Sequence, residues 1–475
     1  WVGVQLLRSV RMGASIPRLA EVHVDGVTIL MTVVVAAVAT LIVSLVPFLR
    51  VRRTSLSAAL SANAPSASGG ATRSRTRRTL VTAQVALALV LLAAAGLLAR
   101  SAGRLRSVDP GFDAPHAIAF RVALPNATYP AAGDAARLIV NALDAIAALP
   151  GVQAAGVVTK LPLDLESRQD SAVWVEDRPV EMGEMVNIHP MLFVSPGYFR
   201  AIGIPLVAGR LFGAIDPAVD PAQRPRELIV SQAFADRYWK GEDPIGRRIR
   251  MHPQDPWSTI VGVVGSVHEE SLEQPPGESV YIPLLVTSAA GTPFTPHDIA
   301  FVVRSAGDAA SLAAPIDRAV RGLAPALPLY RVMPVTDLLS QAVARTTFTL
   351  LLVGVAAAVA TAIGAMGIYG VISYMVSLRT REISVRRALG ASQSDVLRLV
   401  TRHTLTDATI GIGLGLLGAV ALKRLLAPVL FGVTPQDPVA LGGAAALLLL
   451  TAVIASWIPA RRAATVDPAG ALRLE

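Results

Sequence analysis

The sequence contains no cysteine and only three lysines, Lys160, Lys240 and Lys423. The absence of cysteine excludes disulfide bonds, thiol nucleophiles and cysteine-ligated zinc. None of the lysines lies in a Gly-x-x-x-x-Gly-Lys-[Ser/Thr] loop, so this chain carries no P-loop nucleotide site. The His-Glu-x-x-His and Gly-x-Ser-x-Gly patterns are also missing. We therefore expect a non-catalytic protein that uses no cofactor and no metal.

Charged residues are scarce and hydrophobic residues abundant. Only 16% of the 475 residues are charged, whereas 53% are hydrophobic, and the mean hydropathy is +0.53. This composition is too apolar for an ordinary soluble protein and indicates several membrane spans beside a sizeable polar part. The net charge is +9. In a membrane protein an excess of arginine is explained first by the positively charged cytoplasmic loops that orient the spans. We therefore expect a lipid bilayer, and no nucleic acid, as partner.

Long hydrophobic runs cover roughly residues 28–49, 80–99, 348–375 and 439–458. Each is near or above the ~20 residues that cross a bilayer. A shorter, glycine-rich run covers 405–422, and its Gly411 and Gly415 form a small-xxx-small pair that suits close helix packing in lipid. Asp407 lies near the start of this run. An ionisable group there is either functional or, more simply, at the membrane interface.

Arginines cluster between the first two runs, after the third run and in the C-terminal tail. The positive-inside rule places these three regions in the cytoplasm and the large polar segment outside. The predicted segments are: 1–27 outside; 28–50 span; 51–78 flexible basic cytoplasmic linker; 79–99 span; 100–346 outside domain; 347–376 span; 377–404 cytoplasmic coupling segment; 405–422 span; 423–438 outside loop; 439–458 span; 459–475 cytoplasmic tail.

The outside segment mixes strand and helix patterns. Stretches such as "AIAFRVAL", "ELIVS", "STIVGVVGSV" and "IAFVVRS" are rich in β-branched residues and bounded by turn residues. "GDAARLIVNALDAIAALP" and "DAASLAAPIDRAVRGLAP" have helical amphipathic spacing. The predicted fold class is a multi-pass α-helical membrane protein with a large α+β extracytoplasmic domain of about two subdomains. Within that domain "VHEESLE" and "NIHPM" are weak metal-site candidates, and a solvated loop is favoured for the first.

An internal repeat appears when the chain is shifted by 412 residues. Asp25–Leu60 then lies on Asp437–Leu472 without a gap, and Pro47 meets Pro459. Polar, proline and arginine matches at one offset predict a duplicated membrane unit whose first copy is represented by its last span. The opening "WVGVQLLRSV" has no initiating methionine, and we expect further protein upstream.

The stretch "RTREISVRRALGAS" has the charge and apolar pattern of a docking helix, ended by a glycine. Apolar residues stand beside charged ones in this stretch; the candidate residues are Arg381, Glu382, Ile383, Val385, Arg386, Leu389 and Gly390. Such a helix can bury one side in the groove of a protein partner and surround it with charge. It can equally lie on the lipid surface. The residues alone leave both alternatives open.

Several motifs in order resemble the MacB/FtsX-like ABC transporter permeases. They are "RRTLVTAQVALALVLLAAAGLLARSAGRLRSVDPGF", "PGYFRAIGIPLVAGRLF", "MGIYGVISYMVSLRTREISVRRALGAS" and "IPARRAATVDPAGALR". The repeat resembles the duplicated, acidobacterial-type members. The resemblance implies an inner-membrane protein with a periplasmic core domain. It also implies that the coupling segment docks on a separate ABC ATPase subunit, with a periplasmic adaptor or envelope protein as a further partner.

The resemblance implies a permease subunit of an efflux or mechanotransmission complex, in which ATP hydrolysis moves the periplasmic domain. The alternative is an envelope regulatory scaffold that controls a cell-wall hydrolase or another periplasmic partner, because its membrane part would look the same. A secondary transporter is disfavoured, since apart from Asp407 the spans offer almost no ionisable residues.

Overall fold

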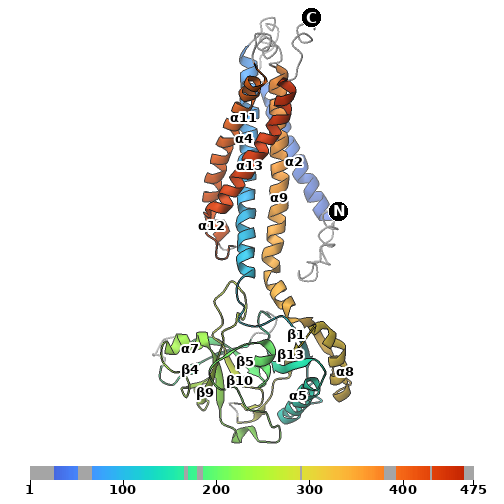
Figure 1. The fold of residues 1–475 in the computed structure, drawn as a ribbon, viewed down its shortest axis with the longest axis vertical. Coiled ribbons are helices and arrows are strands. Elements are labelled where there is room, and N and C mark those ends of the chain that lie inside the picture. Colours follow the sequence, from blue (N-terminus) through green and yellow to red (C-terminus); the bar gives the residue numbers. More distant parts are fainter. Residues whose placement is uncertain are drawn as a thin grey trace. The chain divides into compact units, whose positions relative to one another are not determined.

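The computed structural model describes residues 26–51, 67–164, 169–178, 186–288, 291–378, 392–427 and 430–464. The chain divides into two units (Figure 1). Trp1–Arg106 and Ala344–Glu475 form one, which we call the helical unit. Ser107–Val343 form the other, which we call the α+β unit.

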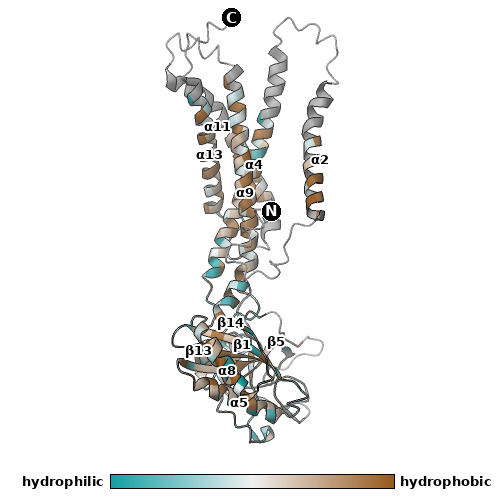
Figure 2. Cartoon of the chain, turned by 90° about the vertical axis from the view of Figure 1, so that its right-hand side faces the viewer, coloured by the Kyte–Doolittle hydropathy of each residue, from teal (hydrophilic) through white to brown (hydrophobic). Residues whose placement is uncertain are grey.

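The helical unit is built from long apolar helices: α2 (Gly26–Val51), α4 (Ala67–Arg106), α9 (Val335–Leu378), α11 (Gln393–Ala421), the short α12 (Lys423–Leu426) and α13 (Pro438–Ala464). Within the described residues, three segments are long and apolar enough to cross a membrane: Arg78–Arg106, Thr346–Tyr374 and Pro438–Pro459. Shorter apolar segments lie at Ile29–Val38 in α2 and Leu405–Ala421 in α11. Hydrophobic colouring predominates along the coloured parts of these helices in Figure 2.

Two of the helices run well beyond the predicted spans. Helix α4 begins at Ala67, so the end of the linker predicted as flexible is helical. Alanine and arginine are good helix formers, and a helix that is already nucleated by a span extends into them at little cost. Helix α9 begins at Val335, before the apolar run. Asp337 lies in its first turn, where a carboxylate is favoured by the helix dipole.

One large mixed sheet organises the α+β unit, with the order β14-β1-β13-β2-β5-β10-β7-β9-β8-β4, β3 beside β5 and β6 beside β9. A separate pair joins β11 and β12. The strands are β1 (Ala117–Ala123), β2 (Val152–Val158), β3 (Asp170–Ala172), β4 (Trp174–Val175), β5 (Ile188–Val194), β6 (Leu206–Gly209), β7 (Glu227–Ser231), β8 (Arg248–Arg250), β9 (Ser258–Val264), β10 (Val280–Pro283), β11 (Val286–Thr287), β12 (Pro293–Phe294), β13 (Asp298–Ser305) and β14 (Leu329–Pro334). Its helices are α5 (Ala132–Ala147), α6 (Tyr198–Ile202), α7 (Gln232–Trp239) and α8 (Ala313–Leu323).

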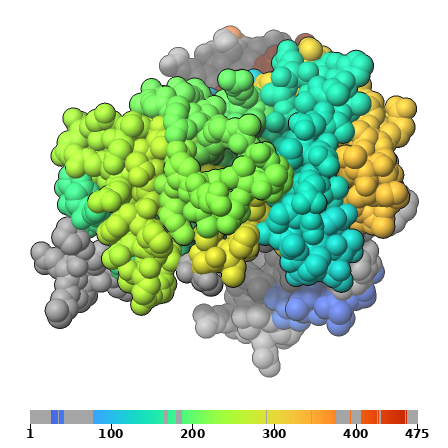
Figure 3. Space-filling model, turned by 90° about the horizontal axis from the view of Figure 1, so that it is seen from below, coloured from blue at the N-terminus to red at the C-terminus, as the bar shows by residue number. Residues whose placement is uncertain are grey.

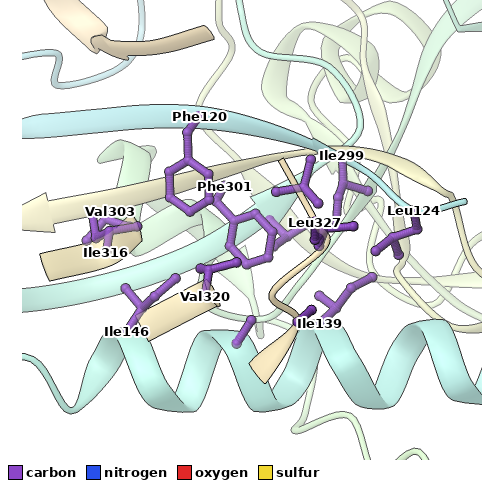
Figure 4. Packing of buried hydrophobic residues seen from close by; sticks show 14 of the residues in the cluster. Phe120, Leu124, Ile139, Ile146, Ile299, Phe301, Val303, Ile316, Val320 and Leu327 are labelled. Carbon is purple, nitrogen blue, oxygen red and sulfur yellow. The ribbon is translucent and has the colours of Figure 1, made fainter. Parts of the chain in front are cut away.

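Two hydrophobic cores form on this sheet. In the first, Phe120 of β1 stacks on Phe301 of β13 at 4.9 Å, and the strands pack against α5 and α8 (Figure 4). Ile139 and Ile146 supply the apolar face of α5. The second core lies around Phe234 and Trp239 of α7 and includes side chains from β7, β9 and β10. The fold class predicted above, apolar helices with a large α+β domain, is therefore confirmed.

Candidate functional site

The predicted coupling residues Arg381, Glu382, Ile383, Val385, Arg386, Leu389 and Gly390 lie outside the described residues. Helix α9 ends at Leu378 just before them, and α11 begins at Gln393 just after them. The segment therefore connects two long helices of the helical unit. A movement of this segment would therefore act on these two helices and on the helices that pack against them.

Two glycines bring α11 against α4 at backbone distance. A Cβ atom on Gly411 would lie 2.9 Å from the carbonyl oxygen of Thr82, and one on Gly415 would lie 2.8 Å from that of Ala86. Real Cβ atoms almost never approach so closely, so only glycine fits at these positions. The close packing predicted from the Gly411 and Gly415 spacing is confirmed.

Helix α4 lies at the centre of the helical unit and contacts α9, α11 and α13. One buried cluster joins side chains of all four helices: Val81, Val85, Ala88, Leu89 and Ala93 of α4, Ile368 and Ile372 of α9, Ala408, Ile412 and Ala419 of α11, and Ala444, Leu448, Ala452 and Ala455 of α13. Small residues predominate on α13, which lets the helices approach closely in the absence of a hydrophobic driving force within lipid.

An ion pair fastens α11 to one end of the α4 span. The Arg78 guanidinium donates through Nη2 to Asp407 Oδ1 at 2.6 Å and through Nε to Oδ2 at 2.9 Å. The Asp407 side chain is 13% exposed and that of Arg78 is 40% exposed. Because the contact is bidentate, it fixes orientation as well as distance. Asp407 thus joins two helices, an assignment that the sequence left open.

A second ion pair fastens α13 to the other end of the α4 span. Arg100 Nη1 donates to Asp437 Oδ1 at 2.7 Å. The same carboxylate accepts the backbone N–H groups of Val439 and Ala440 at 3.0 Å each, so it also caps α13. Ser101 Oγ accepts the backbone N–H of Phe431 at 2.9 Å.

The spacing of the two ion pairs matches a bilayer. Arg78 and Arg100 are 22 residues apart on one helix (100 − 78), which corresponds to about 33 Å at the rise of an α-helix. The hydrocarbon core of a bilayer is about 30 Å thick. The two pairs are therefore about one bilayer thickness apart; one joins α11 to α4 and the other joins α13 to α4.

Within the α+β unit, a buried charge network holds β14 at the point where the chain enters α9. Arg121 Nη1 of β1 and Arg331 Nη1 of β14 each lie 3.2 Å from a carboxylate oxygen of Asp164. Arg121 and Asp164 are each 3% exposed. Asp298 completes the network, because its Oδ1 lies 2.9 Å from Arg121 Nη2 and accepts the hydroxyl of Tyr330 at 2.7 Å. Strand β14 is thus anchored to the sheet by charges and by its pairing with β1.

The weak metal candidates have structural partners. His189, in "NIHPM", is buried in β5 with Nδ1 3.2 Å from a Glu278 carboxylate oxygen and Nε2 2.8 Å from the Tyr238 hydroxyl. Burial lowers the pKa of His189 more than the Glu278 charge raises it. The solvated loop favoured for "VHEESLE" is wrong for its first residues, because His268 and Glu269 are 7% and 4% exposed. Lys160 and Ser279, which surround Glu269, lie outside this motif, so local patterning does not reveal them.

Two family descriptions match successive parts of the chain. The MacB-like periplasmic core domain matches residues 26–319, and the FtsX-like permease C-terminal domain matches residues 354–468. The first match alone covers more than half of the sequence. The chain therefore belongs to the family of membrane permeases with a MacB-like periplasmic core domain, and the α+β unit is that domain.

Named relatives agree with this assignment. The pyoverdine export ATP-binding/permease protein PvdT of Pseudomonas fluorescens (strain Pf0-1) is 31% identical over 282 residues, which cover 57% of this chain and 40% of the relative. The macrolide export ATP-binding/permease protein MacB of Rhodospirillum rubrum is 26% identical over 349 residues, which cover 69% and 51%. The chain thus spans about half or less of the relatives' length, and the matched family descriptions are those of permease domains.

Among solved structures, the periplasmic region of MacB from Actinobacillus actinomycetemcomitans matches 48% of this chain and 91% of that chain, with 11% identity and a TM-score of 0.31. The extracellular domain of the noncanonic ABC-type transporter YknZ from Gram-positive bacteria matches 46% of this chain and 99% of that chain, with 15% identity and a TM-score of 0.28.

Proposed function

We propose that this chain is the inner-membrane permease subunit of an ABC-type efflux or mechanotransmission complex. In this proposal a separate ATPase subunit hydrolyses ATP in the cytoplasm, and the permease transmits the resulting movement to its periplasmic domain. The observation that carries the proposal is the succession of a MacB-like periplasmic core and an FtsX-like permease region in one chain. Relatives that match 57% and 69% of this chain are named as export ATP-binding/permease proteins.

The length of α9 supports mechanical transmission. The helix has 44 residues, or about 66 Å at 1.5 Å per residue, whereas about 20 residues suffice to cross a bilayer. It begins directly after β14, which the buried Asp164 network holds in the sheet. It ends just before the predicted coupling segment. Because α9 is one continuous helix, it can transmit a displacement from its cytoplasmic end to β14.

Two ion pairs on α4 support the proposal that α4, α11 and α13 move together. The Arg78–Asp407 and Arg100–Asp437 pairs hold α11 and α13 against α4 at both ends of its span. Because α11 begins at Gln393, shortly after the predicted coupling residues 381–390, a force on those residues would act on this group of helices as well as on α9. The proposal accordingly needs no polar pathway through the bilayer.

A charge at Leu389 tests the docking of the ATPase. In the proposal Glu382, Arg386 and Leu389 contact the ATPase directly. Leu389→Asp would then place a carboxylate in an apolar contact, and burying an uncompensated charge costs several kcal/mol, with ~1.4 kcal/mol for each tenfold loss of affinity. We expect normal amounts of the variant in the membrane, more than tenfold weaker recovery of the ATPase, and loss of the ATP turnover that the permease stimulates.

The matched control is Arg398→Ala, which removes a charge in the same cytoplasmic region. If the segment instead lies on the lipid surface, Leu389→Asp would keep full ATPase coupling, and the docking proposal would be wrong. Recovery of a cell-wall hydrolase rather than an ATPase with the wild-type chain would contradict the export function and favour the regulatory scaffold.

We also propose that α2 is the duplicated counterpart of α13. At the offset of 412 residues, the first residue of α2, Gly26, corresponds to the first residue of α13, Pro438. An experimental structure of the assembled complex tests this proposal, because α2 should pack on a second helix like α4. A different packing partner for α2 would contradict the duplication.

A further inference from the structure

The α+β unit contains a pocket that the proposed coupling function does not use. Its volume is about 570 Å³, within the range of sites that hold drug-sized ligands. The sheet strands β5, β7 and β10 contribute Met191, Phe193, Leu228 and Ile282 to its wall. Phe294 of β12 adds a further apolar surface.

A loop after β6, residues 212–226, forms another part of the wall through residues that include Phe212, Ile215 and Val219. Figure 3 shows a hollow enclosed by the green part of the chain, to which this loop belongs. Since the lining is mainly apolar, the pocket suits a molecule with an apolar body.

The loop is held in shape by its own hydrogen bonds. Asp216 Oδ1 accepts the N–H of Ala218, and Asp220 Oδ1 accepts the N–H of Ala222, each at 2.9 Å. The Arg224 guanidinium donates to the carbonyl oxygens of Asp216 and Val219. These contacts hold the loop in one conformation, so the pocket is preformed. Binding a ligand therefore costs little conformational entropy.

One end of the pocket has unused polar groups. Arg226 is half-buried, and its Nη1 donates only a long hydrogen bond of 3.5 Å to the backbone oxygen of Thr287. No carboxylate of the described chain lies within ion-pair distance of it. The Thr287 hydroxyl oxygen is buried and finds no hydrogen-bond partner among the described residues. A guanidinium has five N–H donors, so Arg226 has donors left for an anionic oxygen group.

The carboxylates of the lining have different surroundings. Glu227 is paired with Arg210 at 2.5 Å, and Asp216 caps the loop turn. Asp255 lies on the turn between β8 and β9. Glu227 already has its counter-charge, whereas Arg226, Asp216 and Asp255 have no ion-pair partner among the described residues.

We propose that this pocket binds an amphipathic monocarboxylate, with its carboxylate on Arg226 and its apolar body against Phe193, Phe212 and Phe294. Charge-assisted hydrogen bonds from a guanidinium are about twice as strong as neutral ones and select a carboxylate geometry. The apolar walls add affinity with each methylene group that they remove from water.

A single cysteine reports on occupancy, because the native chain has none. Val219→Cys places a thiol in the pocket wall of the full-length chain in lipid nanodiscs, and its rate of reaction with a maleimide is measured against dodecanoate below its micellar concentration. We expect dodecanoate to slow the reaction at least tenfold. Val332→Cys, exposed on β14 and outside the lining, is the control and should be unaffected.

Two comparisons test the head-group assignment. Arg226→Gln in the Val219→Cys background keeps polar donors but removes the charge, and it should raise the half-protecting dodecanoate concentration about tenfold. Arg137→Gln, at an exposed arginine of α5, should leave that concentration unchanged. Dodecylamine should protect far less than dodecanoate. Equal protection by the amine, protection unaffected by Arg226→Gln, or no protection at all would overturn the proposal.

Discussion

Glu269 is a buried carboxyl group whose protonation is coupled to folding. Ser279 donates its hydroxyl to Oε1 at 2.8 Å, while Oε2 is buried and finds no hydrogen-bond partner among the described residues. Burial raises the pKa of Glu269 from 4.5 to about 6. The Lys160 charge and the Ser279 hydrogen bond lower this pKa, and nearby carboxylates raise it further.

Glu269→Gln should alter the pH dependence of stability. Between pH 4.5 and 6 the folded chain holds a proton that the unfolded chain releases, so this group's contribution to stability is present at low pH and falls as pH rises through 6. A shift of this size corresponds to about 2 kcal/mol. Thermal unfolding at pH 4.5 and 7.5 should show a smaller loss of stability at high pH in the variant than in the wild type.

Glu273→Gln is the control for this measurement, since Glu273 is an exposed residue of the same loop. It should leave the pH dependence unchanged. If Glu269→Gln and the wild type lost stability equally between the two pH values, Glu269 would ionise normally in the folded chain, contrary to its burial.

At the residue scale, the sequence pattern identified notable charged residues but not the residues with which they form ion pairs and hydrogen bonds. Asp407 attracted notice because it interrupts an apolar run, yet its partner Arg78 is 329 residues away. In the same way Glu269 was expected in solvent, because Lys160 and Ser279 come from other parts of the chain. Buried polar contacts of long sequence separation depend on the tertiary fold, which local composition does not encode.

Among secondary-structure elements, the helix–helix contacts depend on small residues whose spacing is visible in the sequence. Gly411 and Gly415 face α4, whereas a Cβ atom on Gly413 between them would have nothing within 4 Å. The three glycines therefore form a matched set on one helix, with the same change in helix propensity when each is replaced by alanine.

Gly415→Ala should destabilise the helical unit, and Gly413→Ala should not. A methyl group on Gly415 would lie 2.8 Å from the Ala86 carbonyl oxygen and the Leu89 side chain, and overpacking of this kind costs about 1–3 kcal/mol. At Gly413 alanine only improves helix propensity, by up to about 1 kcal/mol. Thermal unfolding of the purified chain in one detergent measures both. Equal effects of the two substitutions would show that α11 does not pack on α4 through this face.

Strands with clear β-branched patterns were predicted correctly, including β1, β7, β9 and β13. Strand β5 was missed because "IHPMLFV" contains His189 and Pro190, which weaken the strand signal even though the segment pairs with β2, β3 and β10. The amphipathic helix α5 was predicted from its apolar spacing. The pocket was not predicted, since its walls come from strands and a loop that meet only after the sheet is assembled.

On the scale of the whole molecule, function depends on which side of the membrane each unit occupies. The family match indicates that the α+β unit is a periplasmic or extracellular domain, and the arginine distribution predicts that the 377–404 segment is cytoplasmic. These two assignments require each other, because an ATPase is supplied with ATP only in the cytoplasm. An inverted chain would keep its fold and lose the proposed coupling.

Single cysteines test this orientation cleanly, because no native thiol competes. Ser66→Cys and Ser392→Cys should be shielded from a membrane-impermeant maleimide in cells whose outer membrane alone is permeabilised, because both positions are predicted to be cytoplasmic. Ser271→Cys, in the α+β unit, should be labelled under the same conditions. After complete lysis all three should react, which separates shielding by the membrane from burial within the protein. Labelling of position 66 or 392 without that of position 271 would reverse the orientation and remove the basis for cytoplasmic ATPase docking.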